Sequence, residues 1–176
     1  RLFPDTIASL RQLAENFALF VVTNQSGVAN GTLTMRDVHR VNSALDTTLR
    51  EAGIRIRAWY VCPHGPGDDC ACRKPKSAFL EQAKATHGID LARSFVLGDH
   101  PHDALTGAEL GVRGAYLLTG HGQKHRDGLP PDIPVFACLG DAADWILAVA
   151  GCPPARLSTR GCHHRSRNRA IEPLLA

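Results

Sequence analysis

Four side chains that commonly bind metal ions lie close together in the segment CPHGPGDDCACRKPK, residues 62–76. They form two pairs, Cys62 with His64 and Cys70 with Cys72. Residues two apart in an extended backbone point to the same side, so each pair can grip one ion. Glycine and proline between the pairs let the chain fold back and bring them face to face. A closed Cys3His tetrahedron suits a structural zinc ion better than a catalytic one, because no position is left for water.

These cysteines also have simpler interpretations. They could be incidental residues of a loop, or two of them could form a disulfide, although four soft ligands in so short a span disfavour both readings. Arg73 and Lys74 follow directly, and their charges could offset the net negative charge of three thiolates around Zn²⁺. Three of the six cysteines fall in this metal pattern, which fits a reducing cytoplasm better than a secreted disulfide framework. We therefore expect a cytoplasmic protein.

Two further polar segments come directly after short apolar runs. In VVTNQSG, the apolar run ends at Thr23 and Asn24, where hydroxyl and backbone N–H groups can hold an anion; a plain strand-to-loop turn is an equal alternative. In FVLGDHPHD, Asp99 follows the apolar run and Asp103 comes four residues later. Such carboxylates can bind Mg²⁺ directly and through water. The alternative is that Asp99 caps a helix and that Asp103 is a solvated acid in the first turn of that helix.

The elements that must position these residues alternate between apolar strands and helices. Thr34 is expected to cap a helix, with Asp37 in the position of a capping box. The alternation predicts a parallel sheet with helices on both faces, and ligands at the carboxyl ends of its strands. The expected strands are residues 18–23, 58–61, 94–97, 115–118 and 135–138, and the expected helices are residues 5–16, 34–52, 78–87, 103–110 and 141–149.

Length and composition indicate one globular domain. The chain has 176 residues, of which 44% are hydrophobic and 21% are charged. No apolar run approaches the roughly 20 residues that cross a bilayer, and no signal-peptide pattern opens the sequence, so we expect no membrane partner.

The basic character of the chain is concentrated near its end. Residues 151–176 contain five arginines against one glutamate, whereas the whole chain has a net charge of +3. This segment lacks sustained apolar periodicity, so we expect a domain at residues 1–150 and a basic, disordered tail at 151–176. A tail that binds nucleic acid is an alternative, which steep salt dependence would reveal. We favour a solvated extension and no nucleic-acid partner.

Three motifs together resemble a known family. In this order and at these separations, VVTNQSG, CRKPK and VLGDHPHD are similar to the second, third and fourth motifs of the haloacid dehalogenase-like phosphatases. The two metal-binding pairs narrow the resemblance to the branch that contains the heptose bisphosphate and histidinol-phosphate phosphatases. The match covers about residues 2–150. It implies a three-layer, Rossmann-like α/β fold and a monomer that acts on a phosphorylated small molecule.

The resemblance also implies an activity and roles for individual residues. The activity would be Mg²⁺-dependent hydrolysis of a sugar bisphosphate, at the 7-phosphate of D-glycero-D-manno-heptose 1,7-bisphosphate, with histidinol phosphate as the alternative substrate. Thr23 and Asn24 would bind the transferred phosphoryl group. Lys74 would neutralise the charge of that group and of the nucleophile, and Arg73 would reach the substrate.

The resemblance assigns the acidic residues too, but one motif departs from the family pattern. Asp99 would ligate Mg²⁺, and Asp103 would support the metal or the lysine from behind. The family's first motif, a strand that ends in Asp-x-Asp and supplies the nucleophile and the general acid/base, does not occur in the sequence. Asp5 cannot replace it, because Asp5 follows Pro4 and has no second aspartate two residues later. We expect an N-terminally incomplete phosphatase, without the family's central first strand and with little or no activity alone. A noncatalytic, zinc-stabilised binding module is the alternative.

Overall fold

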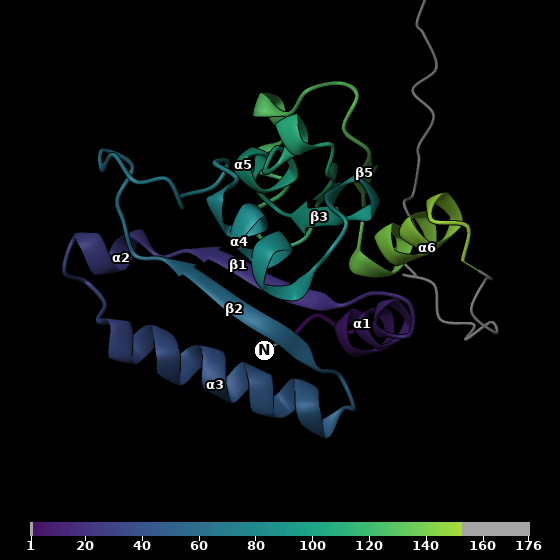
Figure 1. Ribbon diagram of the computed structural model, residues 1–176, viewed down its shortest axis with the longest axis horizontal. Coiled ribbons are helices and arrows are strands. Elements are labelled where there is room, and N and C mark those ends of the chain that lie inside the picture. The colour runs from purple at the N-terminus through teal and green to yellow at the C-terminus, as the bar shows by residue number, and fades with distance from the viewer. Residues whose placement is uncertain (1, 153–176) are drawn as a thin grey trace, which may run out of the picture.

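Strands and helices alternate along the chain in the computed structural model, which describes residues 2–152 (Figure 1). The expected α/β class, with parallel strands and helices, is confirmed. The strands are β1 (Leu19–Asn24), β2 (Ile56–Cys62), β3 (Phe95–Gly98), β4 (Arg113–Leu117) and β5 (Val135–Phe136). The helices are α1 (Thr6–Ala14), α2 (Ser26–Ala29), α3 (Met35–Glu51), α4 (Ala78–His87), α5 (Pro101–Ala104) and α6 (Leu139–Val149), and three short 3₁₀ turns span Leu91–Arg93, Ala108–Leu110 and Arg126–Gly128.

The strands form two parallel sheets instead of one. One sheet pairs β1 with β2, and the other has the order β3-β4-β5. The register of the first sheet places Asn24 opposite Cys62. The polar turn after β1 therefore lies beside the residue at which the metal-binding loop begins.

A cavity of about 770 Å³ lies between the two sheets, lined by residues of β1 and β3. Lys74 and Asp103 also line this cavity, so two charged side chains lie in its otherwise mainly apolar wall. Side chains of α1 and α6 connect the two sheets at one end of it. There Leu13 and Ile146 are buried, and Leu19 from one sheet and Phe95 from the other pack against them.

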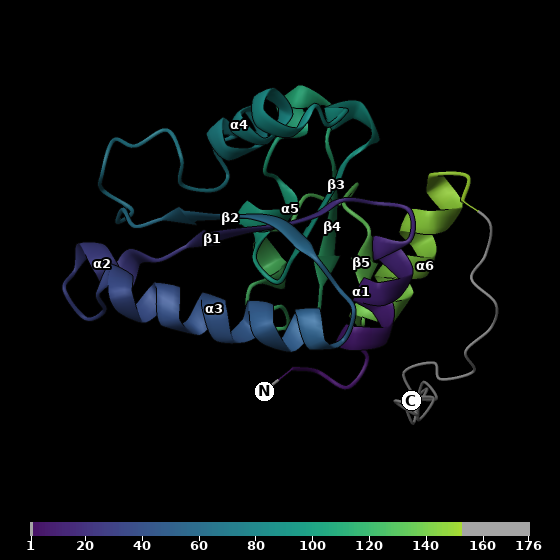
Figure 2. The same ribbon diagram turned by 60° about the horizontal axis from the view of Figure 1, so that its bottom comes forward.

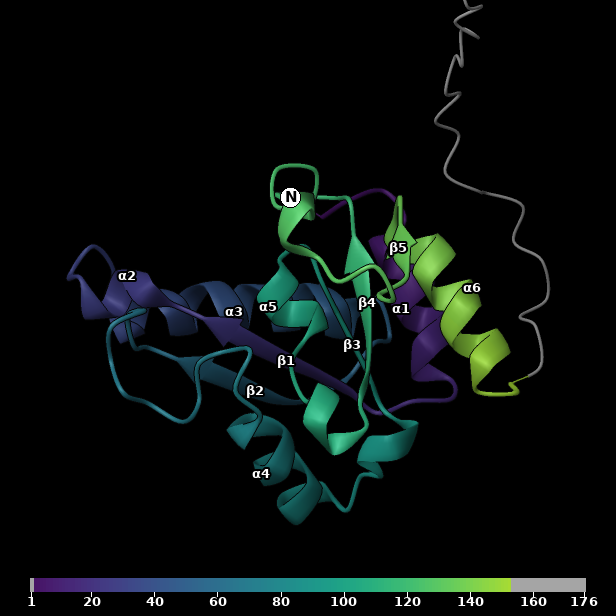
Figure 3. The same ribbon diagram turned by 90° about the horizontal axis from the view of Figure 1, so that it is seen from above.

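Helices α3 and α4 lie on opposite faces of the β1–β2 sheet (Figure 1 and Figure 2). On the α3 face, Leu49 is buried in one cluster with Ile56 of β2. On the α4 face, the ring of Phe79 lies 5.2 Å from that of Tyr60. Seen from above, α1 and α6 run side by side next to β5 (Figure 3). Helices therefore cover both faces of the first sheet, as expected.

The expected helix over residues 103–110 is wrong. Helix α5 begins at Pro101, whose fixed φ suits the first helical turn, and it ends at Ala104. Gly107 then takes a left-handed conformation, with φ +77°, and interrupts the helix before a separate 3₁₀ turn. The α5 backbone packs closely on β4, because a Cβ on Gly114 would lie 1.8 Å from the Ala104 carbonyl oxygen.

The sequence also led us to expect no membrane partner and a disordered tail. Among the residues that the structure places, no helix is both long and apolar enough to cross a bilayer. The expected disordered tail lies outside the described residues, apart from its first two positions.

Candidate functional site

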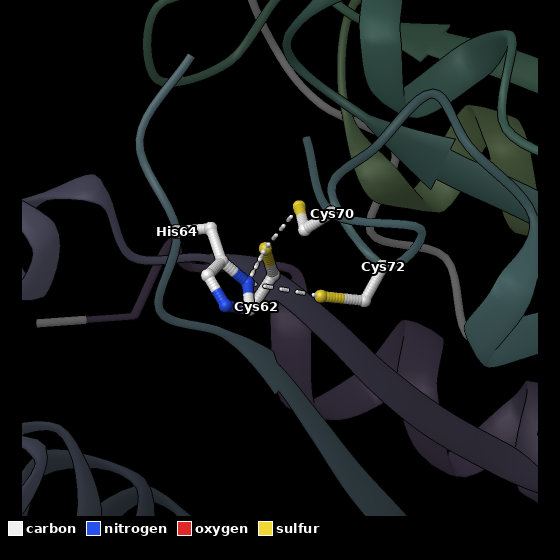
Figure 4. A group of neighbouring side chains, drawn as sticks. All are labelled: Cys62, His64, Cys70 and Cys72. Atoms are coloured by element: carbon white, nitrogen blue, oxygen red, sulfur yellow. Dashed lines mark hydrogen bonds between the residues drawn. The ribbon is translucent and has the colours of Figure 1, made fainter. Parts of the chain in front are cut away.

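The four metal-type side chains of the loop after β2 converge on one point (Figure 4). Cys62 Sγ lies 3.8 Å from Cys70 Sγ and 3.6 Å from His64 Nδ1. Cys72 Sγ lies 3.4 Å from the same nitrogen. A tetrahedral zinc ion bound at ordinary Zn–S and Zn–N lengths would give edges of about 3.8 Å between sulfurs and about 3.6 Å between sulfur and nitrogen. The donor set and its spacing thus fit Zn²⁺, with Nδ1 as the imidazole ligand.

The surroundings of Cys70 and Cys72 shift the pKa values of their thiols in opposite directions. Burial, reinforced by the neighbouring Cys62 and Cys70 thiols, raises the pKa of Cys72 to about 12. Burial acts in the same direction on Cys70, but hydrogen bonds from the Arg73 backbone and the Cys62 side chain outweigh it and lower the pKa of Cys70. At neutral pH, Cys72 would therefore keep its proton unless a bound metal displaced it.

Arg73 connects the metal-binding loop to the start of helix α2. Its Nη1 donates to Ser26 Oγ at 2.8 Å and to the His64 carbonyl oxygen at 3.0 Å. The guanidinium is half-buried and held between α2 and the loop. Sequence reasoning missed Ser26, and its only signal was a small hydroxyl residue directly after Thr-Asn-Gln.

Lys74 is held by an ion pair with little exposure to solvent. Its Nζ lies 2.8 Å from Asp103 Oδ1, and the two side chains are 13% and 14% exposed. The same ammonium group donates to the Val22 carbonyl oxygen at 2.6 Å. The structure therefore brings Lys74 and Asp103 together at the cavity between the sheets. Removal of either charge would leave the other poorly solvated.

Thr23 and Asn24, the last two residues of β1, have separate partners. Gln25 Nε2 donates to Thr23 Oγ1 at 2.9 Å. The Asn24 side chain instead contacts the main chain of Lys74, with Oδ1 3.1 Å from the lysine nitrogen and Nδ2 3.3 Å from the lysine oxygen. Thr23 and Asn24, expected to act together on a phosphoryl group, thus differ in what they contact.

Asp99 lies against the loop after β4. Its Oδ2 accepts from the His121 backbone N–H at 2.8 Å, and its side chain is 39% exposed. This loop approaches closely because Gly120 lacks a side chain; a Cβ there would lie 2.3 Å from Asp99 Oδ2. The alternative that Asp99 caps the next helix is wrong, since His100 is the N-cap of α5. Asp103 is not a solvated acid either, because its Oδ2 accepts from the His100 N–H at 3.1 Å.

These contacts define what the site could offer to Mg²⁺. Both carboxylate oxygens of Asp103 have partners in the protein, whereas Asp99 is more exposed and is the better hard-oxygen ligand. Over residues 2–152, the only group of three or more metal-type side chains that converges is the one in the cysteine-rich loop. Asp99 alone fits Mg²⁺ only in part, so further ligands would be needed.

A histidine cluster beside Asp99 was not anticipated. The ring of His100 lies 4.6 Å from that of His102 and 4.8 Å from that of His125. Burial, followed by the charge of His102, lowers the pKa of His100. The three rings come from two segments, residues 100–102 and residue 125, which only the fold brings together.

Comparison with known proteins agrees with this fold. The family model described as HAD-hyrolase-like matches residues 71–142. The D-glycero-beta-D-manno-heptose-1,7-bisphosphate 7-phosphatase of Neisseria meningitidis serogroup A is 30% identical over 155 residues, which are 86% of this chain and 82% of that protein. The enzyme of the same name from Yersinia pestis is 34% identical over 160 residues, 85% of this chain and 78% of that protein.

The chain is also similar in fold to solved structures of phosphatases. The D,D-heptose 1,7-bisphosphate phosphatase from B. bronchiseptica, complexed with magnesium and phosphate, matches with a TM-score of 0.75 at 29% identity and 84% coverage of each chain. Fold, loop and relatives together define a haloacid dehalogenase-like hydrolase. Within that class, the chain belongs to the family of the D-glycero-D-manno-heptose 1,7-bisphosphate phosphatases. It spans 60% of the length of the Helicobacter pylori relatives that it matches.

Proposed function

We propose that this chain serves the Mg²⁺-dependent hydrolysis of a sugar bisphosphate, at the 7-phosphate of D-glycero-D-manno-heptose 1,7-bisphosphate. The observation that carries the proposal is the Lys74–Asp103 ion pair at the cavity, beside the end of β1 that holds Thr23. The names of the relatives favour heptose bisphosphate over histidinol phosphate as the substrate.

The residues present would act on the phosphate chiefly through charge and position. The Lys74 ammonium group would neutralise the phosphoryl oxygens, and the Thr23 hydroxyl would donate a hydrogen bond to one of them. Arg73, fixed between Ser26 and the His64 carbonyl, would contact a more distant part of the substrate, such as its second phosphate. Bound Mg²⁺, with Asp99 as one ligand, would add charge stabilisation at the same oxygens.

The covalent step needs a group that the sequence does not contain. In the proposed mechanism one aspartate attacks phosphorus in line while the bond from phosphorus to the sugar oxygen breaks, and the second aspartate protonates that leaving oxygen. Water then hydrolyses the aspartyl-phosphate. None of the 176 residues belongs to an Asp-x-Asp motif. The cavity between β1 and β3, with Lys74 at its wall, would receive a strand that carries this motif. The chain alone would then bind phosphate but hydrolyse it poorly.

The test compares this chain with a version that has an added N-terminal strand ending in Asp-x-Asp. We expect heptose bisphosphate hydrolysis to rise by at least about a thousandfold, since removal of a covalent nucleophile typically costs that much or more. A third version with Asn in place of both added aspartates controls for folding. Equal turnover by the chain and the extended version would contradict the proposal. Faster turnover of histidinol phosphate than of heptose bisphosphate would show that histidinol phosphate is the substrate.

A noncatalytic zinc-stabilised module is the second candidate. The observation that favours it is the complete Cys3His geometry in a chain without the Asp-x-Asp motif. Such a module would keep its ligand affinity when Asp99 is changed to Ala, whereas the phosphatase site would lose Mg²⁺-dependent phosphate binding. A cytoplasmic location and a monomeric state also stay predictions; size-exclusion chromatography with light scattering checks the second.

A further inference from the structure

The side chain of Asn24 makes a two-point contact with a residue 50 positions away in the sequence. Its Oδ1 accepts from the Lys74 backbone N–H at 3.1 Å, and its Nδ2 donates to the Lys74 carbonyl oxygen at 3.3 Å. Both residues are half-buried. Backbone polar groups that leave water need partners, and the primary amide of Asn24 supplies one donor and one acceptor to a single residue.

The two hydrogen bonds also set the direction of the Asn24 amide. Both of its polar atoms face the main chain of Lys74, so the amide is turned toward the lysine segment. The neighbouring Thr23 differs, because its hydroxyl contacts the Gln25 side chain. Of these adjacent residues, the threonine hydroxyl is therefore the better direct ligand for a phosphoryl oxygen.

Strand β1 contacts both the main chain and the side-chain ammonium group of Lys74. Asn24 contacts its main chain, and the Val22 carbonyl accepts from its Nζ at 2.6 Å. Asp103 pairs with the same ammonium group from α5. We propose that Asn24 is a positioning residue, which clamps the main chain of Lys74 to β1 and acts on phosphate through the lysine without contacting it. Only the effect on phosphate rests on the proposed function; the clamp itself does not.

Amide hydrogen exchange tests the clamp without any ligand. In Asn24→Ala, exchange of the Lys74 amide should accelerate at least about fivefold, the factor expected for one lost hydrogen bond. Amides in the middle of α3 should exchange at the wild-type rate, which shows that the fold is intact. Asn24→Asp keeps an acceptor for this N–H and should retain most of the protection. Asn16→Ala, which removes an exposed asparagine after α1, is the matched control. Unchanged protection in Asn24→Ala, or an equal loss in Asn16→Ala, would overturn the clamp.

A double-mutant cycle distinguishes action through the lysine from direct contact. Inorganic phosphate is titrated, in the presence of Mg²⁺, into the wild type, Asn24→Ala, Lys74→Met and the double variant. If Asn24 acts through Lys74, its substitution should weaken binding about fivefold in the wild type and should have no further effect in Lys74→Met. Additive losses would overturn the positioning role and indicate that Asn24 contacts phosphate. If the wild type binds no phosphate, the proposed function fails, while the exchange measurement still decides the clamp.

Discussion

At the scale of single residues, Gln25 controls where the Thr23 hydroxyl can donate. The hydroxyl oxygen already accepts from Gln25 Nε2 at 2.9 Å, so its single hydrogen is left to point to another acceptor. A phosphoryl oxygen at the end of β1 would be such an acceptor. The sequence alone suggested an anion site here but did not reveal that the glutamine orients the threonine.

Substitution of Gln25 by Leu should therefore weaken binding of inorganic phosphate. We expect a loss of about fivefold, because the hydroxyl becomes free to rotate and one hydrogen bond of ordinary strength is lost. Titration calorimetry in the presence of Mg²⁺ measures it. Gln82→Leu changes an exposed glutamine of α4 and should have no effect. Unchanged affinity in Gln25→Leu would show that the contact does not orient Thr23 for phosphate.

At the scale of elements, helix α3 begins with a capping box. Thr34 Oγ1 accepts from the Asp37 N–H at 3.2 Å, and Asp37 Oδ2 accepts from the Thr34 N–H at 3.0 Å. The side-chain hydrogen bond from Thr34, followed by the backbone one, lowers the pKa of Asp37. Because the pKa is lower in the folded state, the stabilisation is present above the unfolded-state pKa of about 4 and is lost as pH falls through the folded-state value.

Thr34→Ala should lower the free energy of unfolding by about 1 kcal/mol at pH 7, as loss of an N-cap generally does. Its stability should also fall less steeply than that of the wild type as the pH drops below about 4. Urea denaturation at several pH values measures both effects. Thr47→Ala, in the exposed middle of the same helix, is the control. A cost that is equal at all pH values would show that Asp37 does not take part in the cap.

Bound zinc should strengthen the hold of the metal-binding loop on Arg73. The Arg73 guanidinium contacts the loop at the carbonyl oxygen of His64, whose side chain is a proposed zinc ligand. Loss of the ion would therefore release one of the two hydrogen bonds that hold the guanidinium. We expect one Zn²⁺ per chain by atomic emission. After chelation, trypsin should cleave within residues 70–76 at least about tenfold faster, because local opening exposes the backbone.

Cys70→Ser provides the matching genetic test of the loop. It should lose the zinc and show the fast cleavage without a chelator. Cys152→Ser, at a free cysteine outside the loop, should keep both the zinc content and the slow cleavage. Cleavage that is equally slow with and without metal would mean that the loop is rigid on its own.

At the scale of the whole molecule, the break between the two sheets is the main feature. The cavity of about 770 Å³ removes a stretch of packing between β1 and β3, and side chains of α1 and α6 supply the connection at one end. The ring of Phe17, after α1, lies 5.8 Å from that of Phe95 in β3. A cavity with apolar walls is costly, since its lining loses dispersion contacts.

Filling this cavity with a strand should stabilise the molecule whether or not catalysis becomes possible. An added N-terminal strand that ends in Asn-x-Asn, and so cannot form an aspartyl-phosphate, should raise the midpoint of thermal unfolding by at least about 5 °C. Differential scanning calorimetry measures the shift. The control is an extension of the same length in which glycine and serine alternate at the apolar positions. An equal shift in both would mean that the added strand does not enter the cavity.

Features that depend on neighbouring residues could be predicted from the sequence. The four candidate zinc ligands lie within 11 residues of one another, and the Thr34–Asp37 cap within four, so local backbone geometry almost fixes their contacts. The alternation of apolar and amphipathic segments likewise indicated the parallel α/β class. The predicted helix over 103–110 failed for a local reason, because Gly107 takes a left-handed conformation that spacing alone does not reveal.

Only the tertiary structure decided how the polar residues share the site. Asn24, predicted to bind the phosphoryl group, bonds to the main chain of Lys74, and Asp103, assigned to either the metal or the lysine, pairs with the lysine. Each of these side chains has several possible partners of suitable chemistry. Which one it takes depends on how closely the carboxyl ends of separate strands approach, and that distance is set by packing across the whole domain.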